Sequence, residues 1–274
     1  MLEVSQLSKA YGGQSLFQDA ALQIGRGERL GLIGRNGHGK TTLLRMIVGQ
    51  EQPDTGTLHI PKHYHIGYVE QTLAFSAASL LEEACLGLPP DLRQDSWRAE
   101  KTLAGLGFSH AEMDKPPEVF SGGFQVRLNL AKVLLGQPDL LLLDEPTNYL
   151  DVVSIRWLVG QLRNWKGELL LVTHDRSFLD QVITHTLAIH RGQLRKMRGD
   201  TSKMAEQFER EDEIHEKTRL NQEKKRREAQ EYIDRFRSKA NLASNVQSRI
   251  KALAKMGQLD RLQAISKREF SFNH

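Results

Sequence analysis

The sequence predicts an α/β fold with an antiparallel β layer and a helical subdomain, followed by an α-helical hairpin. A glycine-rich loop at residues 34–42 lies between a strand-like run, Arg29–Ile33, and a helix-like segment, Thr41–Val48. Four consecutive leucines, Leu140–Leu143, are typical of a parallel strand that is buried on both faces. From about Ser202 onward the pattern changes to a long, charged helix. These three features define the predicted architecture.

Composition favours one large domain with an appendage. The chain has 274 residues, of which 39% are hydrophobic and 26% are charged, so it can bury one large core. It has no apolar run of about 20 residues and no cationic leader before an apolar segment, so we expect a cytoplasmic protein without a membrane partner. The net charge is +4, but residues 217–255 hold twelve Lys or Arg against four Asp or Glu, a surplus of eight. The remaining residues therefore sum to about −4, and the basic character belongs to one segment.

The first sixty residues alternate strand-like runs with turns, which predicts the antiparallel layer. The runs are Met1–Leu7, Ser15–Phe17, Ala21–Ile24, Arg29–Ile33 and Thr57–Ile60. Tyr11 lies 23 residues before Gly34, and an aromatic ring there could stack on a purine base. A lone Tyr before two glycines is more often a turn or packing residue.

The loop fits the phosphate-binding pattern GxxxxGK[ST]. Its residues are Gly34, Arg35, Asn36, Gly37, His38, Gly39, Lys40, Thr41 and Thr42. Backbone N–H groups must converge on phosphate oxygens, so we expect the three glycines to bend freely and leave no Cβ in the way. Lys40 would neutralise the β and γ phosphates, and Thr41 would ligate Mg²⁺.

Two further stretches offer polar groups to a phosphate site. The strand-like segment Ile66–Gln71 ends in Gln71, which could reach Mg²⁺ or an attacking water. Ser121, Gly122 and Gly123 precede a helix expected over Val126–Leu135, so they place a hydroxyl and free N–H groups at a positive helix terminus. A second anion site and a plain helix cap both explain that arrangement.

Acidic and imidazole groups follow two apolar strands. Asp144 and Glu145 come directly after the four leucines, at the carboxyl end where open α/β sheets bind ligands. Asp144 can hold Mg²⁺, while Glu145 can face the nucleophilic water as a general base. His174 follows the apolar strand Glu168–Val172 and could sense the γ phosphate, although such a His is more often a structural hydrogen-bonder.

In this order the motifs resemble those of an ATP-binding cassette ATPase. The phosphate loop, Gln71, residues 121–123, residues 140–145 and His174 are similar to the Walker A, Q-loop, signature, Walker B and switch of that family. The resemblance covers residues 1 to about 200. It implies that Tyr11 stacks on adenine, that Asp151 belongs to the loop that crosses to a partner, and that the signature touches ATP held by an opposing cassette. One cassette would then need a second for catalysis.

Within that superfamily the chain resembles the ABC-F translation factors. Residues 144–151 read DEPTNYLD, which is similar to the DEPTNHLD of that family with Tyr149 in place of His, whereas transporter cassettes more often read DEPTSALD. Phe124 stands where transporters carry the Gln of LSGGQ. The segments 232–240 and 247–253 resemble the ABC-F interdomain linker, which reaches toward the ribosomal P-site tRNA.

The linker resemblance implies RNA binding near the tip of a helical hairpin that turns at about Ser238–Ser244. The basic residues expected nearest the tip are Arg235, Arg237, Lys239, Arg249 and Lys251. Charge-rich helices are also normal in a solvated coiled coil, so that alternative stays open.

We therefore expect a cassette domain over residues 1–200 and a basic hairpin over 201–267, with 268–274 as the apparent start of a second cassette. Only 49 residues separate Gln71 from Ser121, so an inserted arm subdomain would be short or missing. The predicted function is hydrolysis of ATP with Mg²⁺, coupled to ribosome and tRNA engagement, with the missing half or a second copy as partner cassette. The alternatives are the ATPase subunit of a membrane transporter and a catalytically silent, ATP-dependent binding module.

Overall fold

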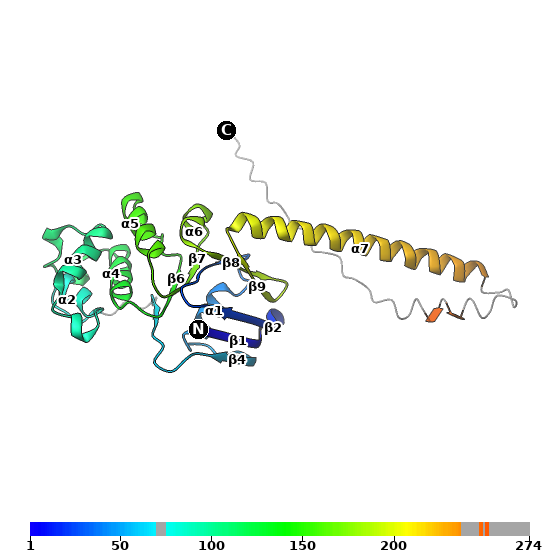
Figure 1. Cartoon of the computed structure of the whole chain (residues 1–274), viewed down its shortest axis with the longest axis horizontal. Helices are drawn as coiled ribbons and strands as arrows, with labels where there is room; N and C mark the ends of the chain where they lie inside the picture. The colour runs from blue at the N-terminus through cyan, green and yellow to red at the C-terminus, as the bar shows by residue number, and fades with distance from the viewer. Residues whose placement is uncertain (70–74, 237–246, 249, 252–274) are drawn as a thin grey trace, which may run out of the picture. The chain divides into compact units, whose positions relative to one another are not determined.

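The computed structural model describes residues 1–69, 75–236, 247–248 and 250–251. Its internal contacts divide the chain into two compact units, Met1–Met204 and Ala205–His274. The first unit combines two β-sheets with the helices α1 to α6, and the second consists, in the part described, mainly of the long helix α7 (Figure 1). The α/β architecture predicted from the sequence is confirmed.

A six-stranded sheet in the order β5-β6-β7-β3-β8-β9 forms the centre of the first unit. Its strands are β3 (Arg29–Ile33), β5 (Ile66–Tyr68), β6 (Leu140–Asp144), β7 (Glu168–Val172), β8 (His185–His190) and β9 (Gln193–Arg198). All pairs are parallel except that of β8 with β9. The strand predicted before the phosphate loop, β3, and the strand predicted before the acidic pair, β6, therefore lie in the same sheet, with β7 between them.

The antiparallel layer is a three-stranded sheet in the order β2-β1-β4. Its strands are β1 (Leu2–Tyr11), β2 (Gln14–Ile24) and β4 (Thr55–His59). The two runs predicted as Ser15–Phe17 and Ala21–Ile24 are a single strand. The register shifts along β1 and β2, and Asp19 has a positive φ of 47°, so a bulge absorbs the residues that interrupt the apolar alternation.

Seven α-helices and three short 3₁₀ turns are found among the described residues. The helices are α1 (Lys40–Ile47), α2 (Leu80–Cys85), α3 (Ser96–Gly105), α4 (Gly122–Leu135), α5 (Val152–Arg163), α6 (Arg176–Val182) and α7 (Thr201–Phe236). The 3₁₀ turns are η1 (Pro90–Leu92), η2 (His110–Glu112) and η3 (Pro117–Val119). Helix α4 begins four residues earlier than expected, because Ser121 is its extended N-cap and both following glycines are helical.

Two apolar clusters cover the two faces of the six-stranded sheet. Leu141 and Leu143 of β6 pack into the cluster formed with α2 to α6, whereas Leu140 and Leu142 pack into the cluster formed with α1, β1 and β2. Successive side chains of a strand point to opposite faces, so an unbroken run of leucines is what a strand covered on both faces requires. All four are at most 1% exposed.

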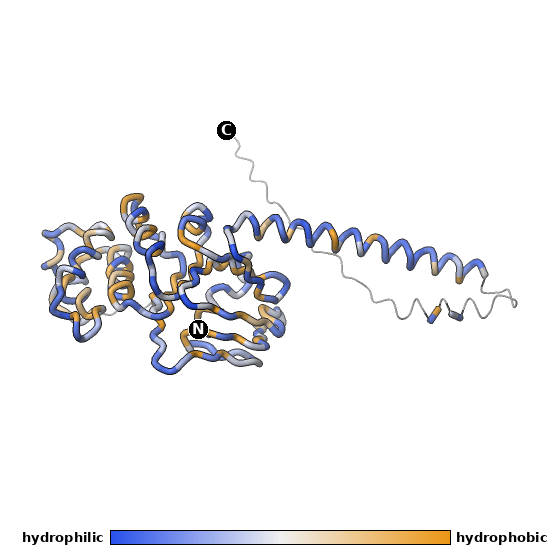
Figure 2. Tube along the Cα trace, in the orientation of Figure 1, coloured by the Kyte–Doolittle hydropathy of each residue, from blue (hydrophilic) through white to orange (hydrophobic). Residues whose placement is uncertain are grey.

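Helix α7 is long and charged, as predicted from residue 202 onward, and Figure 2 shows it mainly hydrophilic, with apolar positions at intervals. It begins where the Thr201 backbone N–H and hydroxyl each donate to the Asp180 carboxylate at 2.9 Å. The predicted turn at 238–244 lies outside the described residues, and of the second arm only residues 247–248 and 250–251 are described, as helix. In the described part of the chain, no helix has the length and apolar character needed to cross a membrane.

One buried carboxylate joins the helices of the smaller subdomain. Glu83 on α2 has a side chain that is only 1% exposed, and it pairs with Lys132 on α4. Its second oxygen accepts hydrogen bonds from the backbone N–H groups of Ser76 at 2.8 Å and Ala77 at 2.9 Å. Burial raises the pKa of Glu83, but the bonds from Lys132, Ser76 and Ala77 outweigh it, so the pKa lies below its ordinary value.

This network predicts that Glu83→Gln lowers the free energy of unfolding by about 1–3 kcal/mol at pH 7, because it removes a hydrogen-bonded ion pair. A carboxyl whose pKa falls on folding contributes stability above its unfolded pKa and loses it as the pH falls through the folded pKa. The difference between wild type and variant should therefore shrink well below pH 4.5. Urea titrations at several pH values measure it, with exposed Glu82→Gln as the control. Equal midpoints for Glu83→Gln and wild type would contradict the assignment.

Candidate functional site

The phosphate-binding loop joins β3 to α1, and two of its glycines need a left-handed backbone. Gly37 has φ 77° and Gly39 has φ 92°. A Cβ on Gly39 would also lie 3.0 Å from Phe17 Cζ, which is closer than side chains normally approach. Gly34 has no positive φ, and its nearest neighbour for a Cβ is at 3.5 Å, so its requirement is weaker than the sequence suggested.

Lys40 brings a positive charge into the cleft beside this loop. Its Nζ donates to the carbonyl oxygens of Gly34 at 2.9 Å and Arg35 at 3.2 Å. Partial burial lowers the pKa of Lys40, while Asp144 and Glu145 act in the opposite direction. Because burial weakens its solvation, the ammonium is suited to bind phosphate oxygens, which supply stronger acceptors than the two carbonyls.

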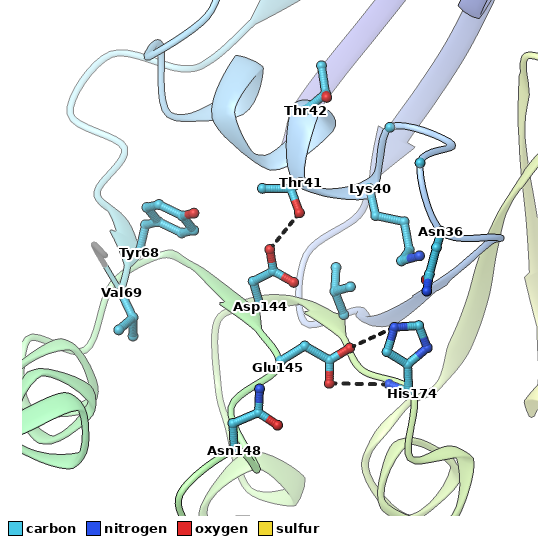
Figure 3. A pocket seen from close by; sticks show the side chains of 13 residues that line it. Asn36, Lys40, Thr41, Thr42, Tyr68, Val69, Asp144, Glu145, Asn148 and His174 are labelled. Carbon is cyan, nitrogen blue, oxygen red and sulfur yellow. Dashed lines mark hydrogen bonds and ion pairs between the residues drawn. The ribbon is translucent and has the colours of Figure 1, made fainter. Parts of the chain in front are cut away.

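The hydroxyl of Thr41, in the first turn of α1, donates to Asp144 Oδ2 at 2.9 Å (Figure 3). Asp144 is the last residue of β6, and its backbone pairs with Val172 of β7. A hydroxyl and a carboxylate are hard oxygen donors, the type that Mg²⁺ prefers beside nucleotide phosphates. The residues present therefore fit a magnesium ion at this point of the cleft.

Glu145 follows Asp144 with a positive φ of 50°, which is uncommon for a residue with a side chain. Its Oε2 accepts hydrogen bonds from the Thr173 hydroxyl at 3.1 Å and from the backbone N–H of His174 at 3.3 Å. Its Oε1 is buried and lies 3.4 Å from His174 Nε2, but accepts no hydrogen bond from the described residues. A buried acceptor without a donor is costly, so this oxygen suits a bound water or another donor from the ligand.

These groups line one cleft of about 520 Å³. The lining residues are Asn36, Gly37, Gly39, Lys40, Thr41, Thr42, Tyr68, Val69, Asp144, Glu145, Asn148, Val172 and His174. The structure thus brings the predicted lysine, hydroxyl, acidic and imidazole groups together. Gln71 lies outside the described residues, although Tyr68 and Val69 at the end of its strand reach the cleft.

Four lining residues were not predicted from the sequence. Asn148 lies within the DEPTNYLD stretch, so its amide beside the acidic pair was the one signal available. Tyr68, Val69 and Val172 give no such signal, because aromatic and apolar residues at strand ends are common in any core.

The signature residues Ser121, Gly122 and Gly123 form the start of α4, and none is among the described residues that line the cleft. They adjoin the loop that follows β6 instead, since a Cβ on Gly123 would lie 3.3 Å from Tyr149 Cβ. The Ser121 hydroxyl makes no capping hydrogen bond within the helix. Ser121 therefore caps the helix through its backbone carbonyl, which accepts from the Gln125 N–H at 3.0 Å, and the anion site stays a prediction.

Arg127, one turn further along α4, was not predicted. Its Nε donates to the Tyr149 carbonyl at 2.6 Å, and its Nη1 donates to the Leu106 carbonyl at 3.1 Å and lies 3.5 Å from Asp151 Oδ2. The guanidinium also lies over the Phe124 ring at 4.5 Å. Its side chain is only 11% exposed, so it fixes the signature helix against the loop after β6.

The remaining predicted residues lie elsewhere. Tyr11, at the end of β1, is 47% exposed and is not in the cleft lining; Lys9 Nζ lies 5.2 Å from its ring centroid. Gly34, Arg35 and His38 belong to the loop but not to the cleft lining. Of the five basic residues predicted to bind RNA, Arg235 lies in the last turn of α7 and Lys251 is exposed. The other three, Arg237, Lys239 and Arg249, lie outside the described residues.

Comparison with known proteins identifies relatives over most of the chain. Family models described as ABC transporter match residues 17–148 and residues 187–272. "Probable ATP-binding protein YheS" of Haemophilus influenzae is 34% identical over 93% of this chain and 45% of its own length. "ATP-binding cassette sub-family F member 3" of Rattus norvegicus is 35% identical over 94% of this chain and 41% of its own length. The chain thus spans less than half the length of these curated relatives.

Solved structures share the fold of the first unit. The ATP-binding subunit of an ABC transporter superposes with a TM-score of 0.61 at 25% identity, covering 76% of this chain and 93% of that one. A dimeric bacterial ABC transporter cassette superposes with a TM-score of 0.59 at 23% identity, covering 72% and 98%. Fold and cleft together define an ATP-binding cassette of the ATPase type. With the sub-family F relatives, the chain belongs to the ABC-F family of these proteins.

The geometry of Glu145 predicts how two substitutions in the cleft differ. Glu145→Gln keeps the side-chain shape but removes the proton acceptor, so ATP should still bind while turnover falls by roughly 10²- to 10⁴-fold. Lys40→Ala should instead weaken nucleotide binding, because the cleft loses its half-buried cation. Calorimetric ATP titrations and steady-state phosphate release measure the two effects. Near-normal hydrolysis by Glu145→Gln would remove Glu145 from the mechanism.

Proposed function

We propose that this chain hydrolyses ATP and uses the nucleotide cycle to control its engagement with the ribosome and its tRNA. The cleft carries the first half of the proposal, since it joins a half-buried lysine, a hydroxyl–carboxylate pair and a carboxylate with one oxygen that accepts no hydrogen bond from the described residues. Membership of the ABC-F family and the basic segment 217–255, which begins within α7, support the second half. Such a function places the protein in the cytoplasm.

In this proposal Lys40 and the loop N–H groups hold the phosphates, and Thr41 and Asp144 hold Mg²⁺ together with Gln71. When bound there, Mg²⁺ would supply neutralisation of phosphate charge. Glu145 accepts a proton from the attacking water at Oε1, the buried oxygen that accepts no hydrogen bond from the described residues. His174 Nε2 lies 3.4 Å from that oxygen, so His174 orients the carboxylate in this proposal and contacts the γ phosphate. Tyr11 stacks on the adenine base.

A second cassette, either a further half of a longer protein or another copy, completes the site in this proposal. Three exposed apolar side chains close together in the sequence support it: Tyr149, which lies against Gly123 of the signature, is 65% exposed, and Val152 and Val153 at the start of α5 are 63% and 75% exposed. Exposed apolar side chains grouped on one surface mark interaction sites. The related dimeric bacterial cassette shows that this fold can pair.

The partner proposal predicts that the ATPase rate per molecule rises with protein concentration, because association limits the number of complete sites. Val153→Glu places a charge on the apolar surface and should suppress that rise, whereas Ile214→Glu, at a 64%-exposed position on α7, should not. Steady-state rates over a wide dilution series, with sedimentation of the same samples, decide the matter. A high rate that is constant on dilution in a monomeric species would exclude the requirement for a partner.

The basic segment is proposed to bind RNA phosphates. Along α7, acidic residues already pair with part of the basic set, as in Lys224–Glu228 at 4.0 Å and Arg227–Glu231 at 3.9 Å. Lys225 and Arg226 have no such ion pair among the described residues, so the part of the helix from residue 217 onward keeps positive charge available to a polyanion. Exposed ion pairs of this kind are weak and leave the charges accessible.

Ribosome affinity should therefore fall steeply with salt, because each phosphate contact releases condensed counterions. Changing Arg235, Arg237, Lys239, Arg249 and Lys251 together to Ala should abolish co-sedimentation with ribosomes. The same change should leave ATP binding intact, and each single substitution should flatten the log–log salt slope by about 0.7 to 1.

The control alters the same number of exposed basic residues on the first unit, namely Arg26, Lys62, Lys101, Lys115 and Lys166. Co-sedimentation at three salt concentrations, with and without ATP, measures the effect. Unchanged affinity and salt dependence in the first variant would favour a solvated coil. A cassette that hydrolyses ATP without binding ribosomes would then fit the transporter alternative better.

A further inference from the structure

One wall of the cleft is formed at the end of a short edge strand. Strand β5 has three residues and lies at one edge of the six-stranded sheet, where it pairs with β6 alone. Its last residue, Tyr68, and the following Val69 line the cleft on the side that faces Asp144 (Figure 3). A three-residue strand with one neighbour is held by few ladder hydrogen bonds, so the position of this wall depends on where the chain is held after Val69.

After Val69 the chain is held by the carboxylate of Glu83 on α2. The backbone N–H groups of Ser76 and Ala77 donate to Glu83 Oε2 at 2.8 Å and 2.9 Å. The other oxygen of Glu83 pairs with Lys132 Nζ on α4, the helix that begins with the signature glycines. One carboxylate therefore joins the segment that follows the cleft wall to the signature helix.

Packing alone does not explain a carboxylate at this position. The Glu83 side chain is only 1% exposed, and its neighbours Leu80 and Ala84 on α2 are buried in the apolar cluster of the subdomain. Burying an ion pair costs desolvation, and apolar side chains of similar volume often stabilise a protein as well or better. A buried polar network whose members all have partners does something else, because it fixes one arrangement of the groups that it joins.

We propose that Glu83 is a positioning residue for ATP hydrolysis, and this inference rests on the proposed function. Its carboxylate holds the segment at Ser76 and Ala77, and with it the cleft wall at Tyr68 and Val69, in a fixed place relative to α4. Glu83 is not among the residues that line the cleft, so it acts through this segment and does not touch the nucleotide.

Two double variants test the proposal, since both lack the ion pair and they differ only at position 83. Glu83→Met/Lys132→Met offers no oxygen to the two N–H groups. It should lower kcat by about tenfold, less than the cost of a full ångström of misplacement. Glu83→Gln/Lys132→Met keeps an amide oxygen that can accept from them, so its kcat should stay within about threefold of wild type. In both variants KM should stay within about twofold, because Lys40 and the phosphate loop are unchanged.

Steady-state phosphate release at one protein concentration measures these rates, and urea titrations measure the stability of each variant. Asp95→Asn removes a partly exposed ion pair with Arg98 that lies within α3 and its cap, and should change neither quantity appreciably. An apolar replacement of a buried pair is often neutral or stabilising, so Glu83→Met/Lys132→Met should be the more stable of the two double variants and yet the slower enzyme. Equal rates, or a higher rate in the more stable variant, would overturn the positioning role.

A second measurement uses wild type alone and depends on no variant's folding. Hydrogen exchange at the Ser76 and Ala77 amides should be at least about tenfold slower than at an unprotected amide, because both N–H groups are bound to Glu83. Exchange at the unprotected rate would contradict the contact. If wild type released no phosphate at any protein concentration, the proposed function would fail and this role with it. If wild type is active and both double variants match it, the positioning role alone is wrong.

Discussion

The register of three buried parallel strands determines where every group of the cleft lies. Asp144 of β6 and Leu32 of β3 both pair with Val172 of β7, so the three strands end at the same level of the sheet. The phosphate loop, the acidic pair and His174 follow these ends directly. A slip of one residue in any pair would turn a buried leucine to the other face and move the polar residue that follows it. Burial of the leucines on both faces thus fixes the geometry of the site.

Much of this arrangement could be predicted because each polar group is adjacent to a strong apolar pattern. The apolar run of the strand at 140–144 predicts that Asp144 and Glu145 lie at its carboxyl end, and the run at 168–172 predicts the same for His174. Arg127 could not be found this way, since its partners are carbonyl oxygens of segments 21 and 22 residues away, and a carbonyl has no sequence signature.

The polar groups of the cleft make few hydrogen bonds, and these are to other residues of the cleft and its loop. Lys40 donates to loop carbonyls, Thr41 donates to Asp144, and Glu145 keeps one oxygen without a hydrogen bond. Phosphate oxygens and metal ions form stronger contacts with an ammonium, a hydroxyl and a carboxylate than these partners do. Side chains already gathered in one cleft need less ordering when a ligand binds, which favours binding.

The loop after β6 links this cleft to the exposed apolar surface. The N–H of Asn148 donates to the Glu145 carbonyl at 3.1 Å, and Arg127 holds the Tyr149 carbonyl at 2.6 Å. Asp151 ends the loop by capping α5 through the Ser154 N–H at 2.8 Å. The segment between Glu145 and the exposed valines of α5 is therefore held by hydrogen bonds at its start, middle and end. A partner that binds at the valines contacts an element continuous with Glu145, so formation of that interface and alignment of the carboxylate depend on the same short loop.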